Sequence, residues 1–278
     1  MLTLLFIAVV LLGRTAAVVL FTVASWLGLR EFFTVTAKRT GVHAGQWLAY
    51  SIVPVNYLWV WLGWYEAFWI SIPVGLLLLM SVYTVSVGKT EGFLVDVAVE
   101  LWGVMLLVFC LSHAALLFAL PEATNQVAGV AGWFVFLIVL TETNDITQAL
   151  WGRQFGKHQV TPTVSPHKTW EGLILGATTT VVLAMALGAL LTPLHQRLLM
   201  ATTETTITLP FFWSAGAGLI IAIGGFFGDI TMSAVKRDAG VKDSGVMLPG
   251  MGGVLDRVDS LTFTAPLFFY FVYFLCGR

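Results

Sequence analysis

Residues 228–260 contain the side chains that are best suited to chemistry. Asp229, Ser233 and Lys236 are separated by four and three residues, so on a helix they lie on one face, with Arg237 beside them. A run without Asp, Glu, Lys or Arg ends directly before Asp229, which places this carboxylate at the end of a predicted membrane segment. An ionisable group there is costly unless it has a partner, so it indicates a functional site.

The same stretch carries a second group of charges closer to its end. Asp256 and Asp259 are three residues apart with Arg257 between them, and Lys242 and Asp243 precede a glycine-rich turn. Carboxylates with a nearby hydroxyl are hard oxygen ligands for Mg²⁺, which commonly binds through one or two carboxylates and the phosphates of a substrate. Lys and Arg would neutralise the remaining phosphate charge. We therefore expect phosphoryl or nucleotidyl transfer at a membrane surface; the alternative is a solvated, salt-bridged hairpin between two spans.

A second polar stretch, residues 141–171, is expected to contribute from another loop. Glu142 and Asp145 follow an apolar run, and at the end of a span they could contact a cation or a polar head group. A structural salt bridge to Arg153 is the alternative. The two polar stretches stand out because most connections elsewhere in the chain are short.

The end of the second stretch is predicted to start a helix. Ser165 fits the N-cap position and Pro166 the first helical position, with Lys168 and Thr169 following. Ser, Thr and Lys side chains at a helix N-terminus can bind phosphate, because the free backbone N–H groups and the helix dipole favour an anion there. Simple capping explains Ser165 equally well.

The rest of the chain has the composition of a membrane scaffold. Of its 278 residues, 58% are hydrophobic and 10% are charged, whereas a typical soluble domain has roughly 25% charged residues. This excludes an ordinary soluble enzyme, a disordered protein and a nucleic-acid binder. A helix needs about 20 apolar residues to cross a bilayer. The charge-free runs of comparable length are residues 41–65, 67–88, 101–121, 123–141, 172–196, 205–228 and 260–277.

The N-terminal region adds one or two further spans. Residues 2–12 and 15–29 are apolar and are separated by a Gly-Arg pair. We expect two helices here, and hence an all-α polytopic integral membrane protein of about nine transmembrane helices, with eight as the alternative. With the N-terminus inside, only Arg14, Arg197 and Arg278 of the 14 Lys and Arg fall outside. This bias predicts that both polar stretches face the cytoplasm from the cytoplasmic (inner) membrane.

From Ser233 to Asp259 the sequence is SAVKRDAGVKDSGVMLPGMGGVLDRVD, which resembles the signature of the phosphatidate cytidylyltransferases, or CDP-diacylglycerol synthases. GKH at residues 156–158 and SPHKTWE at residues 165–171 are similar to the middle motif of that family. The resemblance is specific over about residues 141–267. The part of the chain before it matches only as a hydrophobic, multi-span half.

The resemblance implies a nucleotidyltransferase, in which the phosphate of phosphatidic acid attacks the α-phosphorus of CTP and gives CDP-diacylglycerol and pyrophosphate. It also implies Mg²⁺, with a second cation as an option, and a homodimer. By position, Asp229 and Asp256 would be the metal-binding carboxylates, with Ser233 nearby. The other implied site residues are Lys236, Arg237, Lys242, Asp243, Arg257 and Asp259 on the catalytic side, and Asp145, Ser165, Lys168 and Thr169 for substrate binding.

The chain departs from the family pattern at several positions. The family usually has His where this chain has Met251 and often His at Val246, and residues 145–149 are DITQA where the family has Asp-Ser/Thr-Gly-Ala-Tyr. We therefore expect a divergent member, whose lipid substrate or activity could differ. The match divides the chain into an N-terminal hydrophobic multi-span half, residues 1–122, and a C-terminal catalytic membrane domain with both polar stretches, residues 123–278.

Three other functions stay open. A CTP-dependent lipid or polyprenol kinase would use similar groups but would transfer the γ-phosphate, so that a cytidine label would stay water-soluble. A non-catalytic homologue would bind CTP with Mg²⁺ without turnover. A membrane transporter would show neither activity, and such proteins usually place charges near the bilayer midplane within a repeated fold, whereas here the charges cluster at one surface.

Overall fold

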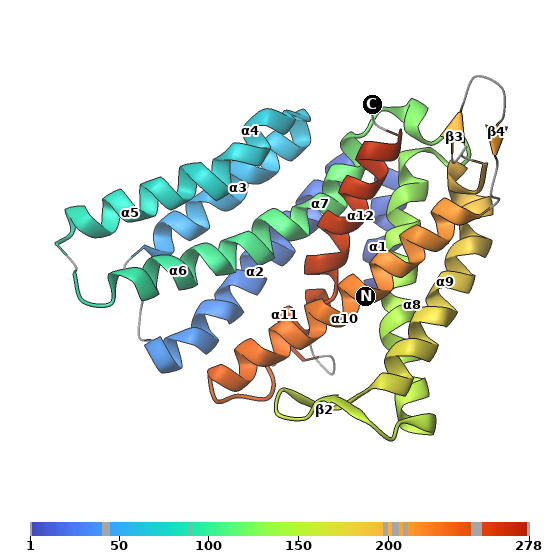
Figure 1. Ribbon diagram of the computed structural model, residues 1–278. Coiled ribbons are helices and arrows are strands. Elements are labelled where there is room, and N and C mark those ends of the chain that lie inside the picture. The colour runs from blue at the N-terminus through green and yellow to red at the C-terminus, as the bar shows by residue number, and fades with distance from the viewer. Residues whose placement is uncertain are drawn as a thin grey trace.

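The computed structural model describes residues 2–40, 45–88, 90–196, 200–201, 206–207, 211–245 and 252–276. Within them the chain is almost entirely helical, and the long helices lie side by side (Figure 1). The α-helices are α1 (Leu2–Leu12), α2 (Arg14–Thr40), α3 (Gln46–Leu62), α4 (Tyr65–Ile70), α5 (Leu77–Ser86), α6 (Phe93–Val104), α7 (Leu111–Leu116), α8 (Gly129–Phe155), α9 (Trp170–Leu191), α10 (Phe212–Asp238), α11 (Leu255–Val258) and α12 (Leu261–Cys276).

Short irregular elements join or extend these helices. The π-helical turns are η1 (Ser71–Leu76) and η2 (Met105–Cys110), and the 3₁₀ turns are η3 (Leu117–Ala119), η4 (Glu122–Thr124) and η5 (Pro193–Gln196). Two antiparallel hairpins pair β1 (Gln159–Thr161) with β2 (Ser165–Thr169) and β3 (Met200–Ala201) with β4 (Thr206–Ile207). The first hairpin connects α8 to α9, at the end of the molecule where the predicted site residues gather.

Seven helices among the described residues are long and apolar enough to cross a membrane. They are Arg14–Ala37, Tyr65–Ser86, Phe93–Ala119, Gly129–Phe155, Trp170–Leu191, Phe212–Asp238 and Leu255–Leu275. The prediction of an all-α polytopic membrane protein is thereby confirmed. Two further apolar helices are shorter, since α1 has 11 residues and α3 has 17. The count of nine spans includes these two helices and stays a prediction.

The N-terminal apolar region forms two helices, as expected. Gly13 separates α1 from α2 and has a φ of +68°, a conformation that residues with side chains adopt rarely. Arg14 Nη2 donates a hydrogen bond to Val60 O at 2.7 Å, near the C-terminal end of α3. The second helix continues to Thr40, beyond the predicted residue 29, and so carries Glu31 within it.

Helices α8, α9 and α10 pack closely because small residues line their contacts. The buried positions of α9 recur every four residues as Gly172, Gly176, Thr180, Ala184 and Gly188. Small residues at this spacing let the backbones of neighbouring membrane helices approach each other.

A similar close approach positions the site. A Cβ atom on Gly228 of α10 would lie 2.6 Å from Asp259 O and 2.9 Å from Ser260 Cα. Such distances are too short for a side chain, so only glycine lets α10 meet the junction of α11 and α12 at this point. Because Gly228 directly precedes Asp229, the contact brings Asp229 to the same junction.

Two expectations about the stretch of residues 141–171 are wrong. Residues 141–155 are not a loop but the last turns of α8, so Asp145 lies on a helix. Ser165 does not cap a helix; it begins β2 and pairs with Thr161. The extended backbone continues through Pro166 to Thr169, so the helix begins only at Trp170. The N-cap of α9 is Thr169, whose Oγ1 accepts a hydrogen bond from Gly172 N at 3.2 Å.

The two halves of the chain pack against each other. Helix α12 contacts α7 as well as α10, and α11 contacts α2. The proposed division at residue 122 therefore separates segments that share contacts, and the catalytic role of the second half alone stays a prediction. Some residues used in the sequence argument lie outside the described residues: Val246, Met251, Lys89, Arg197 and Arg278.

Candidate active site

Three carboxylates from different elements meet at the junction of α10 with α11 and α12. Asp145 comes from α8 and Asp229 from α10, and Asp259 follows α11; Asp229 interacts electrostatically with each of the other two. Asp145 Oδ1 and Ser260 Oγ are both buried, and neither makes a hydrogen bond of ordinary geometry among the described residues, although the Ser260 hydroxyl is close enough to interact with the Asp145 carboxyl. A buried carboxylate oxygen without a donor normally requires an explanation, such as an ion.

A lysine from the first hairpin closes this cluster. Lys168 of β2 forms an ion pair with Asp229, with 2.6 Å between Nζ and Oδ2, and both side chains are largely buried. The Lys168 ammonium also lies 5.8 Å from the centre of the Phe226 ring. Ser233, one turn further along α10, donates a hydrogen bond from Oγ to Asp229 Oδ1 at 3.3 Å. The two polar stretches of the sequence therefore meet at Asp229.

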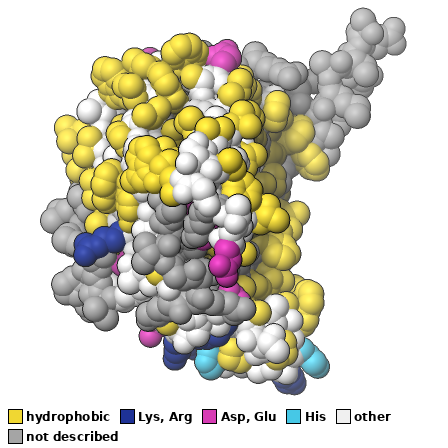
Figure 2. Space-filling view, turned by 90° about the vertical axis from the view of Figure 1, so that its left-hand side faces the viewer, with side chains coloured by type: hydrophobic (Ala, Val, Ile, Leu, Met, Phe, Trp, Pro, Cys, Tyr) yellow, Lys and Arg dark blue, Asp and Glu magenta, His cyan; other side chains and the backbone are white. Residues whose placement is uncertain are grey.

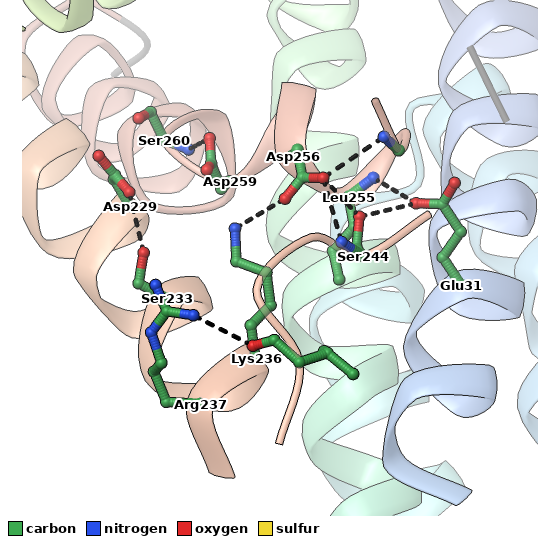
Figure 3. Close-up of polar contacts among 12 residues, drawn as sticks. Glu31, Asp229, Ser233, Lys236, Arg237, Ser244, Leu255, Asp256, Asp259 and Ser260 are labelled. Atoms are coloured by element: carbon green, nitrogen blue, oxygen red, sulfur yellow. Dashed lines mark hydrogen bonds and ion pairs between the residues drawn. The ribbon is translucent and has the colours of Figure 1, made fainter. Parts of the chain in front are cut away.

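Asp256 has a different set of partners. Its Oδ1 accepts a hydrogen bond from Lys236 Nζ at 2.7 Å, and its Oδ2 accepts one from Ser244 Oγ at 2.8 Å. The backbone N–H groups of Ser244 and Gly253 also point to Oδ2, each at 3.3 Å. In Figure 3, Lys236 extends to Asp256, whereas Asp259 lies on the side of Asp229. Asp256 and Asp259 are only three residues apart, yet they point to different neighbours.

Lys236 links the two groups of acids. It binds Asp256 directly and also interacts electrostatically with Asp259. The charged groups therefore follow one another from Lys168 to Asp229, then Asp259, then Lys236 and finally Asp256, with a lysine beside each of Asp229 and Asp256. Among the described parts of the chain, no group of three or more His, Cys, Asp or Glu is arranged as a ready metal centre. The oxygen-rich donor set and the buried Asp145 Oδ1 nevertheless match the ligands that Mg²⁺ prefers.

Other predicted site residues lie around this centre. Arg237 donates hydrogen bonds to Val164 O at 3.3 Å and Val241 O at 3.2 Å, so it fastens the first hairpin to the end of α10. Lys242 and Asp243 are exposed on the loop after α10. Arg257 is exposed and interacts electrostatically with Glu142. Thr169 caps α9, and Ser165 lies on β2.

Two residues that contact the site were missed by sequence reasoning. Ser244 Oγ bridges toward Asp256 and toward Glu31, a buried acid of α2. Only one signal could have identified Glu31: it is an acid within an otherwise apolar N-terminal stretch, in the half of the chain where the motif resemblance is weak. Residue 31 is more than 200 residues from residues 244–256 in the chain, so no spacing pattern within one segment could indicate this contact.

The fold and the site define an integral membrane protein with an acid–base cluster suited to phosphate chemistry at one end of its helices. The family model described as "Cytidylyltransferase family" matches residues 1–275. The chain belongs to the cytidylyltransferase family, and the predicted family resemblance, with its nucleotidyltransferase class, is confirmed.

Several curated proteins are similar to this chain. "Uncharacterized protein YnbB" of Escherichia coli K12 is 44% identical over 263 residues, which cover 95% of this chain and 81% of that protein. "Phosphatidate cytidylyltransferase" of Haemophilus influenzae is 39% identical over 141 residues, 51% of this chain and 46% of that protein. "Phosphatidate cytidylyltransferase 4, chloroplastic" of Arabidopsis thaliana is 37% identical over 150 residues, 52% of this chain and 34% of that protein. The chain thus matches less than half the length of these two named enzymes.

Proposed function

We propose that the protein is a CTP:phosphatidate cytidylyltransferase, which converts CTP and phosphatidic acid into CDP-diacylglycerol and pyrophosphate. The observation that carries the proposal is the ion pair between Lys168 and Asp229, because it joins both polar stretches of the family signature in one site. Family membership and the names of two relatives support the same reaction.

In the proposed reaction the charges of the site match those of the substrates. An oxygen of the lipid phosphate forms a bond to the α-phosphorus of CTP, and the bond from that phosphorus to the bridging oxygen breaks, so that pyrophosphate leaves. The second pKa of a phosphate monoester is about 6, so the nucleophile is already an anion and needs no strong general base. Lys168 and Lys236 would neutralise negative charge that accumulates on the phosphates.

The carboxylates would hold Mg²⁺, and a second cation where one is used. Asp229 and Asp256 remain the proposed ligands with Ser233 nearby, and Asp145 and Asp259 supply further oxygens beside Asp229. Bound Mg²⁺ would supply charge stabilisation for the phosphates. The oxygens Asp229 Oδ2 and Asp256 Oδ1 each contact a lysine, and a cation at these oxygens would free Lys168 and Lys236 to contact phosphate.

An apolar cavity beside the site offers a place for an acyl chain. Its volume is about 430 Å³, and it lies between α2, α6 and α10. Its lining residues are Phe32, Thr36, Ala98, Val99, Trp102, Ala234, Val235, Asp238 and Ala239. Ala234 and Val235 lie between Ser233 and Lys236 in the chain, so the cavity lies against the same turn of α10 that carries these two site residues.

The surface supports a placement of the site at one membrane face. Figure 2 shows apolar side chains over most of the described upper surface and most of the visible Lys, Arg and His side chains at the lower end, with one basic side chain at mid-height on the left. We propose that this end faces the cytoplasm from the inner membrane, as the distribution of positive charge predicts. A homodimer is part of the same proposal, and the molecular mass of the protein particle in detergent tests it.

Cytidylyl transfer by the purified protein tests the proposal. Protein in detergent with Mg²⁺, phosphatidic acid and CTP labelled in the cytidine is expected to form a labelled lipid. Asp229→Asn and Asp259→Asn should each abolish this product, whereas Glu91→Gln, at an exposed acid outside the site, should retain it. Transfer of a γ-phosphate label to the lipid instead would identify a kinase. Binding of CTP without turnover would identify a non-catalytic homologue. A protein that neither binds CTP nor turns it over would fit a transporter. Unchanged turnover in both Asp229→Asn and Asp259→Asn would refute the assignment.

A further inference from the structure

We propose that Glu31, on an N-terminal helix outside the signature, is a positioning residue that contacts both ends of residues 244–255, here called the signature loop, and so sets the orientation of Asp256 and Lys236. The inference rests on the proposed function. Glu31 lies in the middle of α2 and is only 4% exposed. A buried carboxylate is costly to desolvate, so its contacts need to be specific.

Glu31 contacts the signature loop on both of its sides. Its Oε2 accepts a hydrogen bond from Leu255 N at 2.8 Å, at the start of α11. The same oxygen lies 3.3 Å from Ser244 Oγ, at the start of the loop. Ser244 precedes the glycine-rich turn and Leu255 follows it, so the carboxylate lies against both ends of that turn and accepts a backbone hydrogen bond at the second end.

The contacts continue from Glu31 to the charged centre. Ser244 Oγ carries one hydrogen, and it lies closer to Asp256 Oδ2, at 2.8 Å, than to Glu31. Asp256 Oδ1 in turn accepts a hydrogen bond from Lys236 Nζ at 2.7 Å. Figure 3 shows this row of side chains from Glu31 through Ser244 and Asp256 to Lys236. A shift of Glu31 is therefore transmitted to both members of the ion pair.

Two glycines show how closely the loop lies on Glu31. A Cβ atom on Gly253 would overlap with Ser244 Oγ and would lie 2.5 Å from Glu31 Oε2. A Cβ atom on Gly245 would lie 3.1 Å from Glu31 Oε1. A side chain at residue 253 would therefore have to displace Glu31 and Ser244, because the backbone at Gly253 lies directly against them. Removal of Glu31 would take away this contact and the hydrogen bond to Leu255 N.

Variants of Glu31 distinguish the effect of side-chain length from the effect of side-chain charge. Glu31→Gln keeps an acceptor oxygen at the right distance for Leu255 N, whereas Glu31→Asp keeps the charge but is one methylene too short. Glu31→Ala removes both. An exposed acid on another helix, Glu66, provides the matched control as Glu66→Gln.

Two readouts are measured on the full chain in detergent: hydrogen exchange of the Leu255 amide, and kcat and KM for cytidylyl transfer. In Glu31→Ala and Glu31→Asp the Leu255 amide should exchange faster. Their kcat should fall roughly 10- to 100-fold, as is typical when the support of a ligand is removed. Glu31→Gln should stay within about threefold of the unmodified chain, as should Glu66→Gln.

The outcomes that contradict the inference are distinct from failure of the proposed function. Unchanged Leu255 exchange in Glu31→Ala would show that Glu31 does not anchor the loop. Equal losses of kcat in the Gln, Asp and Ala variants, with a lowered melting temperature in each, would show only a general structural role. If the unmodified protein has no turnover, the proposed function fails, whereas the exchange experiment still decides whether Glu31 holds the loop.

Discussion

Lys168 and Asp229 form an ion pair of 2.6 Å between a β-hairpin and a membrane helix, although 60 residues separate them in the chain. The hairpin side chain reaches the carboxylate because α9 and α10 pack directly against each other, so that the ends of both helices lie together. The pair is largely buried, and a largely buried ion pair is strongly affected by the loss of one partner. It therefore provides the most direct test of whether the hairpin belongs to the active site.

Lys168→Ala is expected to lower kcat/KM for cytidylyl transfer by roughly 10- to 100-fold, because a cation near developing phosphate charge is removed. The kcat/KM of Lys168→Arg should lie between that of the unmodified protein and that of Lys168→Ala, since arginine keeps the charge with a different geometry. Steady-state kinetics with phosphatidic acid and CTP measure both variants. The control is Lys157→Ala, at an exposed lysine of the same connection. If Lys168→Ala behaves like Lys157→Ala, the hairpin takes no part in catalysis.

A bulky residue in the apolar cavity is expected to weaken lipid binding selectively. Val99 of α6 lines the cavity, and Val99→Trp would fill space that the acyl chain is proposed to use. We expect KM for the lipid to rise roughly tenfold, which corresponds to ~1.4 kcal/mol, with KM for CTP unchanged. Kinetics with each substrate varied in turn make the measurement.

The matched control lies on the same helix. Val95 of α6 is 49% exposed and does not line the cavity, so Val95→Trp should leave both KM values unchanged. A rise in the lipid KM that is equal in both variants would indicate a general effect on α6. In that case the cavity would not be the acyl-chain site.

The close contact of α8 with α9 is expected to control stability. A Cβ atom on Gly176 would lie 2.9 Å from Gln148 N and Cα, which are backbone atoms that cannot turn aside. Gly176→Ala should therefore destabilise the fold by ~1–3 kcal/mol, the usual effect of overpacking. The melting temperature in detergent measures the change.

Gly216→Ala serves as the comparison for Gly176→Ala. A Cβ atom there would meet only the Phe271 ring, at 3.9 Å, which is ordinary van der Waals contact. Because alanine favours the helix more than glycine does, Gly216→Ala should leave the melting temperature unchanged or raise it. Equal destabilisation by the two substitutions would argue against close backbone packing as the cause.

Local pattern was sufficient to predict the membrane fold and the two stretches that contain the charged cluster. Charge-free runs predicted the spanning helices, because a bilayer excludes charge from any segment that crosses it. The spacing of Asp229, Ser233 and Lys236 predicted one helical face, and α10 contains all three. The expected cap at Ser165 was wrong because strand β2 extends from Ser165 to Thr169, so Thr169 is the residue before the helix and caps it.

The sequence alone therefore determined the class of fold, the chemistry of the charged groups and the family of the chain. Each of these depends on residue type and on spacing over short stretches of sequence. Only the tertiary structure decided which groups meet. Asp259 lies beside Asp229 because Gly228 allows two backbones to touch, while its near neighbour Asp256 binds Lys236 instead. Glu31 reaches the signature loop from more than 200 residues away. Such contacts arise from the packing of whole helices, which no spacing within a single segment records.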